Sequence, residues 1–209
     1  MLSEQEYKNT LFNIIKGKNK NDRGIKYIRK WDYYLEEKKY VLEKCNLTNV
    51  KTAIDIGTGV GMLPYLLQKK GISVEGTDID EETTGPIFKK CCDVINLKVH
   101  ELYINNNEHM KFPGKYDLFI ATRTEFDREA LKPGELFNWE FFFNDVFQYV
   151  NQVFIKTNNA GSGKGYPMWM RKYLWNPAKE NLTKKPFRAW YVIINKQEWQ
   201  SDPLSTLNN

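Results

Sequence analysis

One stretch, residues 52–67, constrains this chain more than any other. It opens with a β-branched run, Thr52–Ile56, that predicts a buried strand, and it continues into glycines at positions 57, 59 and 61 and then an apolar helical segment. Strand, glycine turn and helix form the first unit of an open α/β sheet. Because glycines let the backbone approach a ligand and a helix N-terminus presents unpaired N–H groups, we expect a nucleotide-like ligand at this turn.

Three details of the turn narrow the choice of ligand. Met62 stands where a dinucleotide-binding Gly-x-Gly-x-x-Gly turn requires its third small residue. No Lys-Ser or Lys-Thr follows the glycines, which excludes a P-loop. Asp55 lies at the strand end, where a buried carboxylate is costly unless it is paired and would oppose a bound phosphate. The turn therefore favours a ligand that carries a cationic amino group.

A second strand is predicted to end at Asp78, seventeen residues after Gly61. An acid at this strand end can accept both ribose hydroxyls of an adenosine. The phrases Asp55–Gly61 and Gly76–Asp78 together resemble the motifs of class I S-adenosylmethionine-dependent methyltransferases, and Tyr116–Ile120 resembles the fourth strand of that family. The resemblance covers roughly residues 50 to 195. The aromatic segment from Trp139, followed by a strand, resembles an uncharacterised bacterial or phage-type subgroup of these enzymes.

The resemblance implies a fold and a set of site residues. The expected fold is α/β, a Rossmann-like class I methyltransferase sheet that is mostly parallel with an antiparallel edge strand and has an N-terminal helical cap. We expect residues 1–48 to form the cap, 49–200 the cofactor-binding domain and 201–209 a flexible tail. The implied cofactor-binding residues are Asp55, Gly57, Thr58, Gly59, Gly61, Asp78, Ile79, Asn106 and Thr122.

Asn106 departs from the family pattern. An aspartate commonly sits in this loop of the family and accepts a hydrogen bond from the adenine amino group, whereas residues 105–107 here are all asparagine. An amide oxygen can still accept that bond. The alternative is that the three asparagines form a solvated turn.

The residues after the fourth strand bear on the methyl acceptor. DNA and protein amide-N methyltransferases carry Asn/Asp-Pro-Pro-Tyr/Phe there, and cytosine C5 chemistry needs a Pro-Cys nucleophile, but residues 121–127 contain neither. Arg123, Glu125 and Asp127 fall on the substrate side of the expected sheet. We expect one of Arg123, Glu125 and Asp127 to orient the acceptor or take its proton, with a structural ion pair as the alternative. His109 is a separate candidate for the base.

Further elements follow from hydrophobic periodicity and from breaks at glycine and proline. Helices are predicted over 4–16, 25–45, 86–92, 139–150 and 166–175, and strands over 97–104, 115–121, 152–157 and 187–195. The glycine-rich residues 160–165 fail the phosphate-loop pattern and are predicted to form a lid-like loop. One strand of the family's terminal hairpin is recognisable, and the other is not.

The composition limits the remaining classes. Three cysteines, two of them adjacent, argue against a disulfide framework, favour a cytoplasmic protein and offer no metal-ligand spacing, so no metal is expected. No apolar run is long enough for a membrane span, for which roughly 18 residues are needed. Basic residues gather between Lys16 and Lys30. They form either a solvated linker and helix face or a surface for an acidic substrate or nucleic acid.

The sequence therefore predicts an enzyme that transfers a methyl group from S-adenosyl-L-methionine to a small-molecule acceptor, releasing S-adenosyl-L-homocysteine. Direct SN2 displacement needs mainly alignment of donor and acceptor, because the sulfonium is already activated. Two alternatives remain: an RNA or DNA methyltransferase that uses the basic segment, and a non-catalytic protein that binds the donor. A nicotinamide-dependent oxidoreductase is the weakest rival, given Met62 and Asp55.

Overall fold

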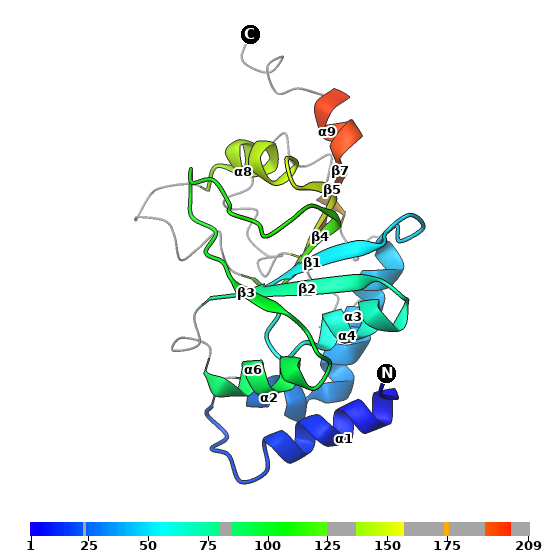
Figure 1. Cartoon of the computed structure of the whole chain (residues 1–209), viewed down its shortest axis with the longest axis vertical. Helices are drawn as coiled ribbons and strands as arrows, with labels where there is room; N and C mark the ends of the chain where they lie inside the picture. The colour runs from blue at the N-terminus through cyan, green and yellow to red at the C-terminus, as the bar shows by residue number, and fades with distance from the viewer. Residues whose placement is uncertain (23, 80–84, 125–136, 157–173, 176–190, 202–209) are drawn as a thin grey trace. The chain divides into compact units, whose positions relative to one another are not determined.

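The computed structural model describes residues 1–22, 24–79, 85–124, 137–156, 174–175 and 191–201 (Figure 1). The chain divides into two compact units, Met1–Leu102 and Tyr103–Asn209. Three predictions fall outside the described residues: the lid at 160–165, the candidates Glu125 and Asp127, and the tail from 202 onward. The predicted tail 201–209 is wrong at Ser201, which ends a helix. The predicted boundary between residues 48 and 49 stays a prediction.

The first unit contains three parallel strands, β1 (Thr52–Ile56), β2 (Ser73–Asp78) and β3 (Val99–Glu101), in the order β3-β2-β1. β1 and β2 lie where the sequence placed them. The strand predicted over 97–104 is only three residues long, because the Leu97 N–H bonds to the Cys92 carbonyl and so belongs to the turn that precedes the strand.

Five helices are described in this unit: α1 (Glu4–Ile14), α2 (Ile25–Arg29), α3 (Trp31–Lys44), α4 (Met62–Lys69) and α6 (Pro86–Asp93). The prediction of one helix over 25–45 is wrong in one respect. Lys30 adopts φ −104° and ψ 38°, outside the helical region, and separates α2 from α3. Helix α1 packs against α2 and α6, and α3 packs against α4.

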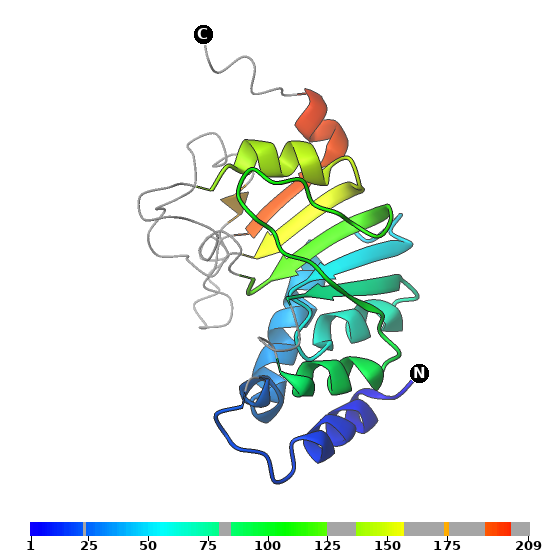
Figure 2. The same cartoon turned by 60° about the vertical axis from the view of Figure 1, so that its left-hand side comes forward.

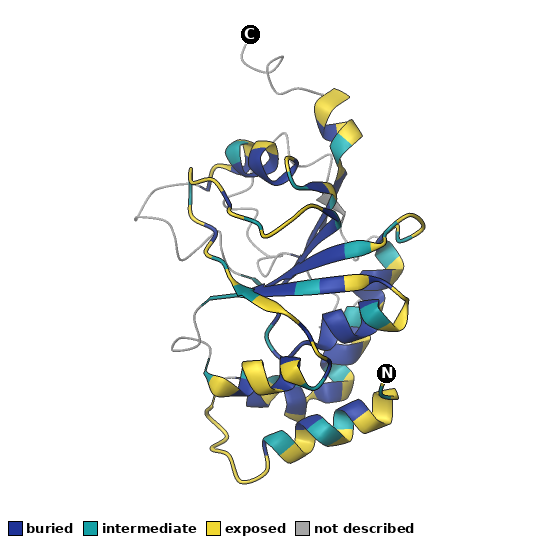
Figure 3. Cartoon of the chain, viewed as in Figure 1, coloured by how far each residue is buried: buried dark blue, intermediate teal, exposed yellow. Residues whose placement is uncertain are grey.

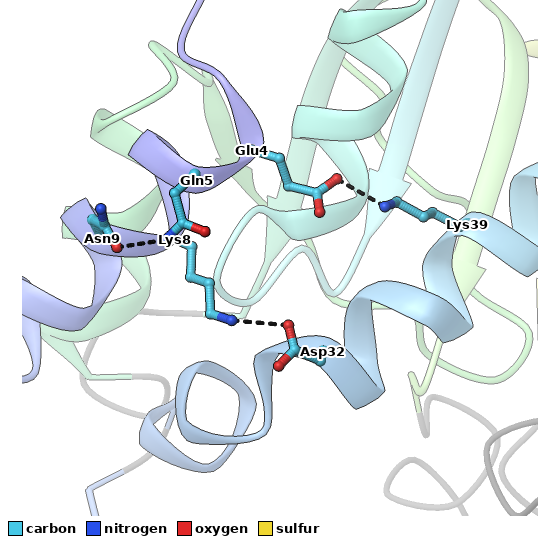
Figure 4. Close-up of polar contacts among 6 residues, drawn as sticks. All are labelled: Glu4, Gln5, Lys8, Asn9, Asp32 and Lys39. Atoms are coloured by element: carbon cyan, nitrogen blue, oxygen red, sulfur yellow. Dashed lines mark hydrogen bonds and ion pairs between the residues drawn. The ribbon is translucent and has the colours of Figure 1, made fainter.

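Apolar burial holds the N-terminal helices in place. Tyr7, Leu11, Ile28 and Trp31 are almost completely buried, and α4 is buried along most of its length (Figure 3). Two ion pairs also join α1 to α3, Lys8 to Asp32 at 2.9 Å and Glu4 to Lys39 at 2.8 Å (Figure 4). These pairs are largely exposed and each contributes at most about 1 kcal/mol, so the buried side chains dominate.

In the second unit, β4 (Tyr116–Thr122) and β5 (Val150–Lys156) run parallel, and β7 (Tyr191–Asn195) runs antiparallel beside β5 (Figure 2). β6 (Leu174–Trp175) pairs antiparallel with β7. The hairpin of which the sequence revealed one strand is therefore present. The helix predicted over 166–175 is wrong at its end, where residues 174–175 form β6, and residues 166–173 lie outside the described part of the chain. Parallel strands with an antiparallel edge confirm the predicted α/β class.

Two helices are described in this unit, α8 (Trp139–Val146) and α9 (Lys196–Ser201). The stripe predicted on α8 is buried: Trp139, Phe142, Phe143 and Val146. The helix was predicted to reach Val150, but it ends at Val146, and Val150 is the first residue of β5. Its β-branched side chain suits a buried strand at that position.

The described residues contain neither a membrane-spanning helix nor a cluster of metal ligands. No helix among them is both long enough and apolar enough to cross a membrane. No group of three or more His, Cys, Asp or Glu side chains among them is arranged to hold a metal ion. The three cysteines are free and buried.

Candidate functional site

The turn between β1 and α4 depends on its glycines. Gly57, Gly59 and Gly61 have φ values of 67°, 56° and 73°, in the left-handed region that side chains disfavour. The turn is pinned to β2, because the Thr58 N–H donates to the Thr77 carbonyl at 2.9 Å. The glycine pattern in the sequence is thus the consequence of a backbone that other residues adopt only under strain.

Gly76 must be a glycine for a separate, steric reason. A Cβ at Gly76 would lie 2.6 Å from Thr58 Oγ1, closer than real Cβ contacts allow. A residue with a side chain at this position of β2 would therefore push the turn away from the strand. This contact explains why a glycine stands two residues before Asp78 in the motif Gly76–Asp78.

Asp78 lies at the carboxyl end of β2, directly beside the turn. Its Oδ2 accepts from the Gly59 N–H at 2.9 Å, and its Oδ1 accepts from the Ile79 N–H at 3.0 Å. Burial raises the pKa of Asp78, while the two backbone N–H bonds oppose that rise. A carboxylate oxygen has more than one lone pair, so each oxygen can accept a further hydrogen bond from a ligand hydroxyl.

Asp55 lies beneath the turn and is 2% exposed. Its Oδ2 accepts from Thr58 Oγ1 at 2.8 Å. Burial raises the pKa of Asp55 to about 7, and the charge of Lys38 opposes this rise. A ligand ammonium placed near Asp55 would stabilise its ionised form, as the sequence analysis expected of a cationic amino group.

Three side chains from outside the motif also contact the turn, and sequence reasoning missed them. The Tyr7 hydroxyl of α1 donates to the Val60 carbonyl at 2.9 Å, and Cys92 Sγ of α6 donates to the Gly59 carbonyl at 3.4 Å. The ring of Phe88 approaches the same glycine, with Cζ 3.9 Å from the position of a Cβ on Gly59. These contacts join residues far apart in the sequence, so no local pattern signals them.

The predicted site residues of the second unit have partners within that unit. Asn106 Oδ1 accepts from the Asn138 N–H at 2.8 Å, and Asn138 Nδ2 donates to Asn107 Oδ1 at 2.7 Å. The Asn138 side chain also caps α8 by accepting from the Phe141 N–H. The loop is therefore braced against the start of α8 and is not a freely solvated turn. The adenine contact assigned to Asn106 stays a prediction.

His109 forms a pair with a buried carboxylate. Its Nδ1 lies 2.7 Å from Asp145 Oδ1, and Asp145 also accepts from the Met110 N–H at 2.7 Å. The His109 side chain is 72% exposed, whereas Asp145 is 2% exposed. The carboxylate fixes the orientation of the imidazole and leaves the ring accessible to solvent.

Polar residues also end the neighbouring strands β4 and β5. Thr122 is the last residue of β4, and Arg123 after it has a left-handed φ of 65°, a strained conformation for a residue with a side chain. Lys156 ends β5 opposite Thr122 and is 4% exposed. Burial lowers the pKa of Lys156 to about 7.

Comparison with solved structures identifies the fold. One similar structure is TrmK of M. capricolum, solved in complex with its natural cofactor product S-adenosyl-homocysteine. The match covers 78% of this chain and 68% of that chain, with 20% sequence identity and a TM-score of 0.50. The chain has the class I methyltransferase fold. This confirms the fold expected from the glycine turn and Asp78.

Two further structures are similar over different shares of their length. An O-methyltransferase from a trans-AT PKS multienzyme of Brevibacillus brevis, in complex with S-adenosyl-L-homocysteine, matches at 18% identity and a TM-score of 0.42. That match covers 57% of this chain and 40% of that one, so the chain spans less than half of that protein. The ribosomal protein L11 methylase of Lactobacillus delbrueckii subsp. bulgaricus matches at 18% identity and a TM-score of 0.46, over 77% of this chain and 78% of that one.

Comparisons by sequence gave a different result. No protein-family model matches the chain, and no curated protein sequence matches it either.

Proposed function

We propose that this protein transfers a methyl group from S-adenosylmethionine to an acceptor. The observation that carries the proposal is the pairing of two carboxylates with one glycine turn. Asp55 lies buried beneath the turn, and Asp78 is bonded to the turn through the Gly59 N–H. The first suits an α-amino group and the second a ribose diol, and S-adenosylmethionine carries both.

Each residue of the turn has a role in this proposal. Asp55 and Thr58 face the methionine end of the donor, where the left-handed glycines let the backbone come close. Asp78 accepts the two ribose hydroxyls, and the Ile79 N–H holds the carboxylate in place. The family resemblance also assigns Asn106 and Thr122 to the donor, and those two assignments stay predictions.

The transfer itself asks little of the protein. A lone pair of the acceptor attacks the methyl carbon of the sulfonium while the C–S bond breaks, and the electron pair of that bond stays on sulfur. S-adenosylhomocysteine results, and the acceptor loses a proton to a base or to solvent. Alignment of the two molecules supplies most of the rate enhancement. His109, whose imidazole is held by Asp145 and is open to solvent, is the described candidate for the base.

The acceptor class has two candidates. The residues after β4 carry no motif for amino-group or cytosine C5 methylation of nucleic acid, and this led the sequence analysis to a small molecule. A specific observation favours a nucleic acid instead: the lysines and arginines described between Lys16 and Lys30 are all exposed. Gly24 of the same stretch lies against the Phe88 ring, which also approaches the glycine turn.

Thermal unfolding with S-adenosylmethionine, S-adenosylhomocysteine and NAD in separate samples tests the donor. A ligand at 100 times its dissociation constant stabilises by about 2.7 kcal/mol. For a chain of this size the midpoint should rise by roughly 5 to 11 °C. We expect this shift with the first two ligands, none with NAD, and none in Asp78→Ala. Asp22→Ala, which changes an exposed aspartate without a side-chain partner among the described residues, is the matched control and should keep the shift. No shift in the unmodified protein would refute the proposal.

A further inference from the structure

The positive charge of this protein is concentrated in one short part of the chain. We define the basic segment as residues 16–22 and 24–30, which hold six lysines and arginines and a single acid, Asp22. Its formal net charge of +5 equals that of the whole chain, so all other residues together sum to zero. A solvated surface usually intersperses both signs, and the basic segment does not.

These side chains are available to a partner. All six are exposed, and Lys26 lies over the ring of Tyr27, with Nζ 4.8 Å from its centroid. Among the residues that the structure describes, the other five form no ion pair: Lys16, Lys18, Lys20, Arg29 and Lys30. By contrast, Lys8 and Lys39 on the adjoining helices are paired with carboxylates (Figure 4). The basic segment therefore carries several positive charges that no described carboxylate pairs with.

The basic segment is also anchored beside the glycine turn between β1 and α4. Gly24 has a φ of 90°, and a Cβ there would lie 2.6 Å from Cε1 of Phe88. Cζ of the same ring lies 3.9 Å from the position of a Cβ on Gly59. One aromatic ring thus separates the basic segment from the glycine turn. The segment is therefore anchored, at Gly24, close to the glycine turn.

We propose that the basic segment binds the phosphate backbone of an RNA and that this RNA is the methyl acceptor. The acceptor role rests on the proposed methyl transfer from S-adenosylmethionine. The binding role does not, because it follows from the charge and exposure of the segment alone.

A polyanion explains this surface better than a small acceptor. A small molecule carries one or two charges and gains little from several lysines in water. A nucleic acid gains from each of them, because every neutralised phosphate releases condensed counterions. The spread of charge over residues 16 to 30 therefore fits a chain of phosphates.

Chemistry favours RNA over duplex DNA. A base inside a duplex must be extruded before a donor can reach it, whereas RNA loops and single strands already present unstacked bases. RNA also offers ring nitrogens and 2′-hydroxyls as acceptor atoms. Methylation of such atoms does not need the amino-group motif that residues 121–127 lack.

Binding of a fluorescent single-stranded RNA of about 20 nucleotides, measured by anisotropy as salt is raised, tests the proposal. Six contacts at roughly 0.7 each predict a slope near −4 in log K against log salt, which lowers the affinity roughly 300-fold between 50 and 200 mM. The variant Lys18→Gln/Lys20→Gln should bind on the order of tenfold more weakly and reduce the slope by about 1.4. Its matched control is Lys69→Gln/Lys70→Gln, which removes two exposed charges at the far end of α4 and should bind normally.

The outcomes separate the two proposals. Absent or salt-independent RNA binding, equal losses in the two double variants, or tighter binding to duplex DNA or to vesicles of anionic lipid would each overturn the inference. Thermal shifts with S-adenosylmethionine, run on the same variants, report on the donor site separately. RNA binding without a donor shift in the unmodified protein would refute the proposed function and the acceptor role, whereas a donor shift without RNA binding would refute the inference alone. Radiolabelled methyl transfer to the bound RNA is the expected final result.

Discussion

Removing the hydroxyl group of Tyr7 is the sharpest single test of what holds the glycine turn in place. This hydroxyl donates to the Val60 carbonyl at 2.9 Å within the core. The ring itself is fixed independently, stacked on Tyr65 at 4.3 Å and edge-on to Trp31 at 5.5 Å. Tyr7→Phe therefore removes one oxygen atom and leaves the packing of the ring in place.

The expected loss of stability follows from the Val60 carbonyl, which Tyr7→Phe leaves without its hydrogen-bond donor. A buried acceptor that loses its partner costs about 1–3 kcal/mol. For a chain of this length, about 2 kcal/mol corresponds to a fall of roughly 4–8 °C in the unfolding midpoint. Val60 lies between Gly59 and Gly61, so the loss falls on the turn itself. We expect the affinity for S-adenosylmethionine to drop several-fold as well, because binding must then restore the geometry of the turn.

Calorimetry of unfolding and titration with S-adenosylmethionine measure the two effects. Tyr65→Phe is the control, since it also removes one tyrosine hydroxyl, but that hydroxyl donates to the Leu2 carbonyl near the chain start at 3.2 Å. The control should lose less stability and bind the donor normally. Unchanged donor affinity in Tyr7→Phe, together with a midpoint within a degree of the unmodified protein, would refute the role assigned to this hydrogen bond.

Two more predictions concern the same turn. Because burial raises the pKa of Asp55 to about 7, the ligand-free protein should lose stability as the pH rises from about 4 to about 7. Donor affinity should instead fall about tenfold from pH 8 to pH 6, as the carboxylate is protonated, and this dependence should vanish in Asp55→Asn on isothermal titration. Gly61→Ala should cost more stability than Gly71→Ala. Both have a left-handed φ, but only a Cβ at Gly61 would lie within 3.3 Å of Ile95 and Tyr7. Equal losses on thermal unfolding would contradict this, and only Gly61→Ala should weaken donor binding.

The glycine turn could be predicted from the sequence because its conformation makes demands that only glycine meets. Left-handed φ values require Gly57, Gly59 and Gly61, and the approach of Thr58 to β2 requires Gly76. Such demands leave glycines at fixed spacings, and these remain visible whatever the rest of the chain does. Strands β1 and β4 were placed well for a related reason, since their buried residues form short apolar runs, whereas β2 was placed by the alternation of its residues.

The rest could not be predicted, because it depends on contacts between distant residues. The break at Lys30 interrupts an apolar stripe that is continuous in the sequence, so periodicity alone predicted a single helix. β6 is only two residues long and exists through its pairing with β7. The hydrogen bond from Tyr7 to Val60 spans 53 residues and has no local signature.

The first 44 residues matter to the proposed donor site because the glycine turn is unfavourable on its own. It combines three left-handed glycines, each of which loses much conformational freedom on folding, with the buried Asp55 beneath them. Contacts from α1 and α6 offset part of that cost: the Tyr7 hydroxyl on the Val60 carbonyl and the Cys92 thiol on Gly59. The N-terminal helices belong to the same compact unit as the turn. They therefore support the turn that we propose binds the donor, and they also present the basic segment that we propose binds the acceptor.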